Sequence, residues 1–278
     1  MAALSDDSKQ SDPEKLRGLR RPSAQVSHHI HCNDQALDED VFSAFPLLRF
    51  DARLPRRWFH RFQHVYMWAL FPLMQLAFQV GDLKALFTRR TEGASLRGAS
   101  LPELASVVLG KAAHFGLLLA APALLHGGSF AGVLPGAAAY VAVQGVVLAG
   151  TFAVSHNLAE VKAPALTGGE AWSRDWGVQQ VLTSASWGGA VGNFMTGGLN
   201  LQVEHHMFPS IAFLHYPAIA AIVEDECAKR GVPYAKYGTF PAILASFVDF
   251  MRRTGEAEQV PLNNATRGPG GKLAVLAL

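Results

Sequence analysis

The chain has 278 residues and a formal net charge of +2, and it shows no basic stripe with interleaved aromatic residues, which argues against a nucleic-acid-binding protein. Half of its residues are hydrophobic and 17% are charged, whereas charged residues make up about a quarter of a soluble domain. The composition therefore favours a membrane protein. Two cysteines make no disulfide framework and are expected to be free thiols facing a reducing compartment.

Both ends of the chain have the composition of disordered segments. Residues 1–25 are polar, charged and without apolar periodicity, and they contain no apolar core of the kind found in a cleavable signal peptide. Residues 254–278 carry prolines and several glycines. The folded domain is therefore expected to be residues 26–253.

The first group of histidines lies at the start of this domain. His28, His29 and His31 stand within the stretch SHHIHCND, and the acidic run Asp38–Asp40 follows it. Three imidazoles in four residues could hold a metal ion, and nearby carboxylates could orient them. The alternative is a polar loop that happens to contain histidines.

A basic and aromatic stretch, residues 53–64, leads into an apolar run at residues 65–80. Arginines beside Trp and Phe are typical of a helix at a membrane–water interface. The apolar run has about sixteen residues, which is short for a span of roughly 20. It is predicted to be interfacial or partly re-entrant, and His60 and His64 are predicted to be interface residues rather than ligands.

Two longer apolar stretches, residues 104–126 and 130–153, are each predicted to cross the membrane. The uncharged link at 127–129 implies a tight hairpin. Lys and Arg residues between 84 and 97 mark the side before the hairpin as cytosolic. His114 lies within the first span and is either a functional candidate or a hydrogen-bonded packing residue.

The second span ends just before His156, which should emerge on the same cytosolic side as the first histidines. A Trp-rich polar segment, residues 170–189, is predicted to lie along the membrane surface. It delivers the chain to Gln202, His205 and His206, whose i, i+3, i+4 spacing places them on one helix face. The alternative for this group is an exposed polar patch.

Together these histidines predict a metal centre on the cytosolic face. Several neutral imidazoles with few carboxylates suit iron, copper or zinc better than magnesium or calcium. Beside apolar helices, such a centre has access to a lipid chain, and the chemistry that needs it is oxygen-dependent attack on an unactivated C–H bond.

The motifs resemble those of the membrane fatty acid desaturase family, and in particular its front-end acyl-lipid branch, where Gln replaces the first His of the third histidine box. The resemblance rests on HHIHCND with its acidic run, Ser155-His156-Asn157, GGLNLQVEHHMFP at 197–209, HYP at 215–217 and GVPY at 231–234. It implies an all-α integral membrane protein with one transmembrane helical hairpin plus cytosolic and interfacial helices that carry the histidine boxes.

The resemblance also implies a non-haem di-iron enzyme of the endoplasmic reticulum. It would use O2 and electrons from cytochrome b5 to insert a cis double bond between an existing one and the carboxyl end of an acyl chain, alone or as a dimer with other desaturases. The implied metal ligands are His28, His29, His156, Gln202, His205 and His206. Residues of second rank, with hydrogen-bonding or packing roles as alternatives, are His31, Asn33, Asn157 and His215.

The chain departs from the family pattern upstream of these motifs. Nothing before residue 24 matches the first histidine box, Ala24 stands where the second box should have another His, and no fused cytochrome b5 motif is present. The expectation is therefore an N-terminally truncated desaturase with weak or no di-iron binding. The alternatives are a non-catalytic remnant that pairs with a full-length relative, and a sphingolipid desaturase or hydroxylase on the same scaffold.

Overall fold

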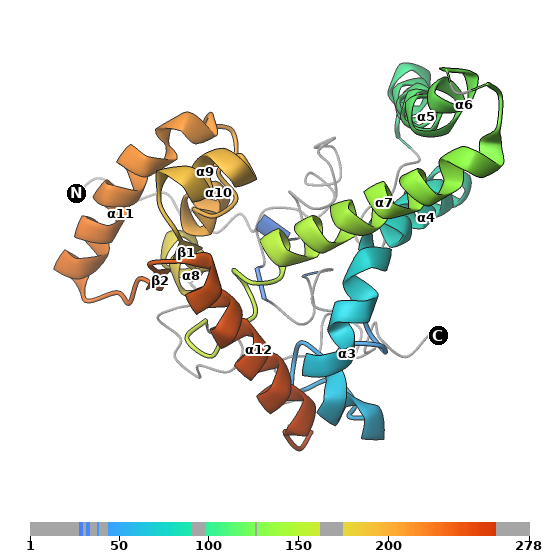
Figure 1. Cartoon of the computed structure of the whole chain (residues 1–278). Helices are drawn as coiled ribbons and strands as arrows, with labels where there is room; N and C mark the ends of the chain where they lie inside the picture. The colour runs from blue at the N-terminus through green and yellow to red at the C-terminus, as the bar shows by residue number, and fades with distance from the viewer. Residues whose placement is uncertain are drawn as a thin grey trace.

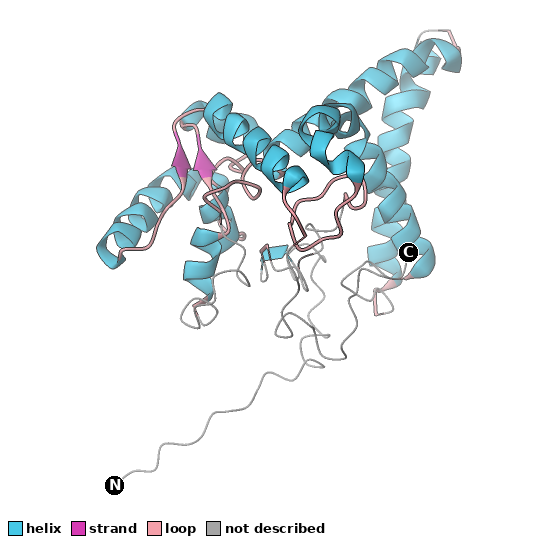
Figure 2. Cartoon of the chain, turned by 90° about the horizontal axis from the view of Figure 1, so that it is seen from below, coloured by secondary structure: helices cyan, strands magenta, loops and turns pink. Residues whose placement is uncertain are grey.

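The computed structural model describes residues 28–29, 32–33, 38, 44–89, 98–125, 127–161 and 175–259. These residues are mostly helical (Figures 1 and 2). The α-helices are α3 (Gln63–Leu70), α4 (Met74–Thr88), α5 (Leu101–Phe115), α6 (Ala121–Leu125), α7 (Phe130–Phe152), α8 (Trp176–Leu182), α9 (Ala190–Thr196), α10 (Gln202–Met207), α11 (Tyr216–Arg230) and α12 (Phe240–Glu256). Short helical turns are η2 (Trp58–Phe62), η3 (Phe71–Leu73), η4 (Gly116–Ala120) and η6 (Phe213–His215), and the strands are β1 (Ser186–Trp187) and β2 (Lys236–Tyr237).

Two helices are long and apolar enough to cross a membrane. They are Leu101–Leu125, which joins α5, η4 and α6, and Phe130–Phe152, which is α7. Their ends agree with the predicted spans to within three residues. In their most apolar windows, 0% and 11% of the residues are buried inside the protein. This exposure of Leu, Val and Ala side chains suits contact with hydrocarbon and not the core of a soluble domain.

The apolar run at 65–80 extends further than predicted. It belongs to an almost continuous helical path from η2 through α3 and η3 to the end of α4 at Thr88. Pro72 is accommodated because it stands at the start of the η3 turn, where its missing N–H is not needed. This path packs against α7 through η3 and α4.

Close packing at two points holds these helices together. A side chain at Gly145 of α7 would meet the backbone oxygens of Phe71 and Pro72 at 2.6 Å, so only glycine allows the two helices to approach this closely. The Lys111 ammonium group in α5 bonds to the side chains of Gln79 and Asp82 in α4. The path through α4 is therefore anchored to both candidate spans.

The main hydrophobic core lies where the end of α7 meets β1 and α12. Ala149 and Val154 pack there with Phe71, Trp187 and Phe247, and all five side chains are buried. Figure 1 shows α7 running from the α5–α6 end of the molecule towards β1 and α8. This core fixes the segment that follows α7, which carries His156.

The region after α7 differs from the sequence-based expectation in two ways. Residues 180–187, predicted to lie on the membrane surface, are buried, because this segment forms the end of α8 and strand β1 inside the protein. The all-α prediction is wrong in one small respect, since β1 pairs in parallel with β2, Ser186 opposite Lys236. This two-residue pairing is visible in Figure 2.

Two helices, α11 and α12, close the described part of the chain. Helix α11 ends at Arg230, and Gly231 caps it in the left-handed conformation with φ 66°, as the Gly-Val-Pro sequence indicates. Helix α12 continues to Glu256, with Thr254 and Gly255 buried, so the first residues of the predicted tail are folded. Residues 1–25 and most of the tail lie outside the described residues.

Two histidines outside the cluster, His60 and His114, have packing contacts within the protein. His60 is fully buried: its Nε2 donates to the Pro46 carbonyl at 2.8 Å and its Nδ1 accepts from the Arg57 amide. The interface prediction for His60 is therefore wrong. His114 makes an edge contact with the ring of Phe115 and faces Tyr140, which is the packing alternative.

Candidate metal centre

Five of the predicted ligand histidines meet in space. The ring centroid of His28 lies 4.7 Å from that of His156 and 4.8 Å from that of His206. The ring of His29 lies 4.5 Å from His206 and 4.8 Å from His205. Scattered packing histidines would not assemble in this way, so the geometry favours a common site over the polar-loop and surface-patch alternatives.

Local structure explains how α10 contributes three of the candidate residues. Gln202, His205 and His206 share one face of this short helix, and Gln202 and His206 are 2% and 0% exposed. Gly198 sets up the approach to α10: its φ is +91°, and a Cβ there would lie 2.4 Å from Phe213 Cβ. Only glycine is compatible with both conditions. His156 is placed by the end of α7, which the main core holds.

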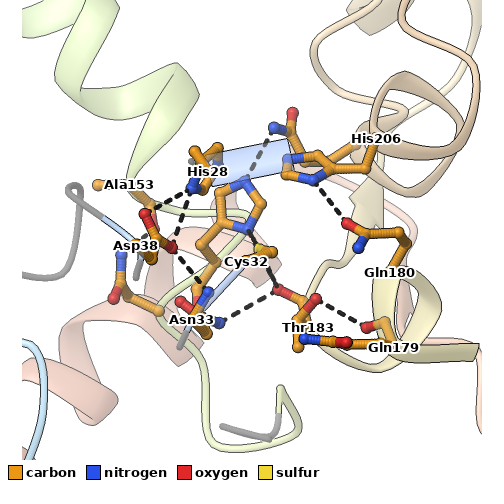
Figure 3. A network of polar contacts seen from close by, with 12 residues as sticks. His28, Cys32, Asn33, Asp38, Ala153, Gln179, Gln180, Thr183 and His206 are labelled. Atoms are coloured by element: carbon orange, nitrogen blue, oxygen red, sulfur yellow. Dashed lines mark hydrogen bonds and ion pairs between the residues drawn. The ribbon is translucent and has the colours of Figure 1, made fainter. Parts of the chain in front are cut away.

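Each of three central imidazoles has its Nδ1 held by an oxygen (Figure 3). His28 Nδ1 donates to both carboxylate oxygens of Asp38 at 3.0 Å. His206 Nδ1 donates to Gln180 Oε1 at 3.0 Å. These bonds fix the tautomer and turn each Nε2 towards the cluster, as in metal-binding histidines with outer hydrogen-bond partners.

The third central ring is that of His156. Its Nδ1 lies 3.1 Å from the Thr183 carbonyl oxygen, and its Nε2 lies 2.9 Å from the side-chain nitrogen of Gln202. The ring is thus held between α8 and α10. Gln202 reaches the same cluster as the five histidines.

Burial favours the neutral form of four imidazoles of the cluster, those of His29, His156, His205 and His206. Burial, with a contribution from His205 and His28, lowers the pKa of His29 to about 4. Burial and the neighbouring rings also lower the pKa values of His156 and His206 well below their ordinary value. Neutral imidazoles carry the free lone pairs that a metal ion needs.

The donor set fits a metal ion. His29 Nδ1, His206 Nε2 and Gln202 Oε1 are buried and have no hydrogen-bond partner. One donor atom from each of His28, Cys32, His156 and His206 lies within 4.8 Å of the others. Donors on one tetrahedral ion lie about 3.3–3.6 Å apart, so small side-chain rotations would complete the site.

The residues of second rank are spread more widely. The side-chain amide of Asn33 donates hydrogen bonds to the carbonyls of His156 and Thr183, so it links the first group of histidines to the segments that carry these two residues. Asn157 turns back to the Ala153 carbonyl of the helix end. His215 is exposed at the start of α11. His31 lies outside the described residues.

No sequence motif predicted that some of the residues in this site belong to it. Gln180 and Thr183 hold the rings of His206 and His156, but they come from a segment that was predicted to lie along the membrane surface. Asp38 belongs to the acidic run that predicted carboxylates near the first histidines, and Cys32 stands within the first group itself. Only the three-dimensional structure connects these residues to the cluster.

A family model for fatty acid desaturases matches residues 22–238. The chain belongs to the fatty acid desaturase family. It is 61% identical over 244 residues to an acyl-lipid (7-3)-desaturase, chloroplastic, from Chlamydomonas reinhardtii, a match that covers 86% of this chain and 47% of the relative. An acyl-lipid (8-3)-desaturase of Physcomitrium patens is 32% identical, in a match that covers 84% of this chain and 49% of the relative. An sn-1 linoleoyl-lipid 6-desaturase of Arthrospira platensis is 28% identical, in a match that covers 82% of this chain and 62% of the relative.

This desaturase chain spans about half the length of the first two of these relatives. No solved structure matches it. The expected location in the endoplasmic reticulum is not supported, because the relative with 61% identity is named as chloroplastic. Membrane association rests on the two apolar helices.

Proposed function

We propose that this desaturase chain contributes the iron-binding site of a front-end acyl-lipid desaturase, with His28, His29, His156, Gln202, His205 and His206 as di-iron ligands. The observation that carries the proposal is the cluster of five largely buried imidazoles, in which His156 follows directly on the apolar membrane-length helix α7. Three of its polar atoms still need a partner. Iron is among the metals that such an imidazole-rich set prefers.

The proposed reaction removes two hydrogens from adjacent methylene groups. One –CH2–CH2– unit, one O2, two electrons and two protons give one cis –CH=CH– unit and two waters. When bound, the iron would supply the activation of O2 that makes an unactivated C–H bond reactive.

The protein's own residues position and protect this chemistry. Asp38 and Gln180 hold the rings of His28 and His206 in one orientation. Burial of His156, Gln202 and His206 keeps bulk water away from the donors. The core around the end of α7 fixes the distance between the cluster and the apolar helix along which an acyl chain would lie.

The substrate class follows the names of the relatives, which are acyl-lipid and linoleoyl-lipid desaturases. We take the acceptor to be an acyl chain of a membrane lipid that already carries a double bond. Cytochrome b5 is the electron donor implied by the resemblance, and a chloroplast electron carrier is the alternative. Supplying each reduced carrier to membranes that contain the chain distinguishes them.

The test combines metal analysis with lipid profiling. The full chain is expressed in a host that makes polyunsaturated lipids, and iron per chain is measured after purification in detergent. The assembled cluster replaces the earlier expectation of weak or no di-iron binding. We expect iron in the wild type, its loss in His156→Ala and His206→Ala, and its retention in the exposed control His215→Ala. Iron-free protein from an iron-replete host would refute the proposal.

Lipid profiling of the same cells identifies the reaction. A new double bond on the carboxyl side of an existing one supports front-end desaturation. A hydroxylated chain or a modified sphingolipid would instead assign a different oxidation to the same site.

A further inference from the structure

The short helix η2 carries cations and aromatic rings that the proposed function does not use. It turns His60 into the protein and leaves Trp58 and Phe62 on the surface, 76% and 46% exposed. Arg57 and Arg61 are also exposed, and the Arg61 guanidinium lies over the ring of Phe62 at 4.6 Å. We call these four exposed residues, Arg57, Trp58, Arg61 and Phe62, the outer face of η2.

The positive charge of this outer face is not compensated by the residues that the structure describes. The neighbouring cations have carboxylate partners, since Arg53 pairs with Asp51, and Arg56 pairs with a glutamate beyond the end of α12. Neither Arg57 nor Arg61 makes an ion pair within the described part of the chain. No acidic residue follows Asp51 in the sequence until α4. The outer face is therefore suited to an anionic partner.

The position of η2 relative to α7 places it at the depth of lipid headgroups. Phe71, at the far end of α3, packs against Ala149, which stands one turn before the end of α7 at Phe152. At about 1.5 Å of rise per residue, Ala149 lies about 5 Å inside that end, and η2 lies at most about 15 Å along the path from Phe71. Figure 1 shows α3 leading away from α7 beside α12.

The headgroup layer reaches about 5–8 Å beyond each face of the hydrocarbon core. If α7 crosses the membrane, η2 lies within about 10 Å of the face at Phe152. Exposed apolar side chains connect the two levels, because Val65, Trp68 and Leu73 follow η2 on the way to α4. A bilayer accommodates this order of cations, aromatic rings and apolar side chains. An acidic soluble protein would match only the arginines.

We propose that the outer face of η2 binds anionic phospholipid headgroups. Arg57 and Arg61 donate to phosphate oxygens, to which the planar guanidinium is well matched. Trp58 and Phe62 lie at the boundary between headgroups and acyl chains. Such contacts fix the height of α3, and with it the end of α7, against the bilayer surface. The inference lies outside the histidine cluster and does not rest on the proposed function.

The fluorescence of Trp58 tests this contact. The full chain is reconstituted in nanodiscs of phosphatidylcholine mixed with phosphatidylglycerol, and one lipid or the other carries bromine on its acyl chains close to the headgroup. Bromine quenches an indole ring at contact, and subtracting the signal of Trp58→Phe isolates this ring from the other tryptophans. We expect Trp58 to be quenched more strongly by brominated phosphatidylglycerol than by brominated phosphatidylcholine.

The charge variants identify the groups that select the lipid. Each arginine near an anionic surface strengthens binding about fivefold, so Arg57→Gln/Arg61→Gln should lower the preference for phosphatidylglycerol roughly 10–30-fold. Lys229→Gln/Arg230→Gln is the matched control, because it removes the same charge from exposed positions at the end of α11. This control should keep the wild-type preference.

Three outcomes would overturn the inference. Equal quenching of wild-type Trp58 by the two lipids would show an apolar anchor without headgroup recognition. No quenching by either lipid would show that η2 faces water, as the docking of an acidic soluble protein requires. A wild-type preference retained in Arg57→Gln/Arg61→Gln would show that other groups select the lipid.

A salt titration of the wild type needs no substitution and so does not depend on the folding of a variant. Salt screens exposed charges, so the preference for phosphatidylglycerol should fall as the salt concentration rises, while Trp58 stays quenched by both lipids. A preference that is independent of salt would refute the role of the two arginines. Iron binding does not enter either measurement, so failure of this inference leaves the proposed metal centre untouched.

Discussion

Gly145→Ala should disturb both the packing of α7 and the histidine cluster. A Cβ at this position would lie 2.6 Å from the backbone oxygens of Phe71 and Pro72, so the two helices must separate by about 0.8–1.4 Å to reach ordinary contact. Overpacking of this kind costs about 1–3 kcal/mol. Gly150→Ala is the matched control on the same helix, because its Cβ would meet only Phe240 Cζ at 3.8 Å.

Both substitutions gain helix propensity of about 1 kcal/mol, so the difference between them isolates the clash. Roughly 2–4 °C of unfolding temperature corresponds to each kcal/mol in a chain of this size. We therefore expect Gly145→Ala to unfold roughly 2–12 °C below Gly150→Ala when both are heated in the same detergent. The separation should also move His156, so Co²⁺ affinity should fall in Gly145→Ala alone. Equal unfolding temperatures would show that η3 yields freely and that the close approach has no energetic weight.

Gln180→Leu removes the hydrogen-bond acceptor of His206 Nδ1 and should weaken Co²⁺ binding about 10–100-fold. The control Gln179→Leu, at the neighbouring position, should leave Co²⁺ binding unchanged. Equal Co²⁺ affinities of the two variants would contradict the role assigned to Gln180. Tyr234→Phe deprives the buried carboxylate of Glu204 of a 2.8 Å hydrogen bond and should cost about 1–3 kcal/mol of stability. The unfolding temperature of Tyr234→Phe tests this loss of stability, and an unfolding temperature equal to that of the wild type would contradict it. Removing bound metal with a chelator should lower stability by about 3–4 kcal/mol if the ion was present at 100–1,000 times its dissociation constant. Thermal unfolding before and after metal is restored tests that expectation.

Periodicity and composition predicted the long-range layout of the chain well. Apolar runs of about 23 residues predicted both candidate spans, because few structures other than a membrane helix use such a run. The i, i+3, i+4 spacing predicted that Gln202, His205 and His206 share a face, and α10 has that geometry. The position of His156 at the end of α7 followed from the span itself.

The sequence could not predict contacts that depend on tertiary packing. Residues 180–187 look amphipathic in isolation, yet the core formed by α7 and α12 buries them and turns Gln180 and Thr183 towards the histidines. The residues around His60 are basic and aromatic, as at a membrane interface, but its side chain is buried in the protein and bonds to the Pro46 carbonyl. In each case the deciding partner is distant in sequence or belongs to a loop without periodicity.

The buried acceptors of the cluster link its stability to its chemistry. His29 Nδ1, His206 Nε2 and Gln202 Oε1 each lack a partner, and an unmet buried polar atom costs about 1–3 kcal/mol. Three of them together cost an amount comparable to the 5–15 kcal/mol that separates a folded domain from its unfolded chain. A packed core alone would favour apolar side chains at these positions. We therefore propose that a bound ion offsets this cost, so that metal loading would contribute to the folding of this region as well as to its proposed reactivity.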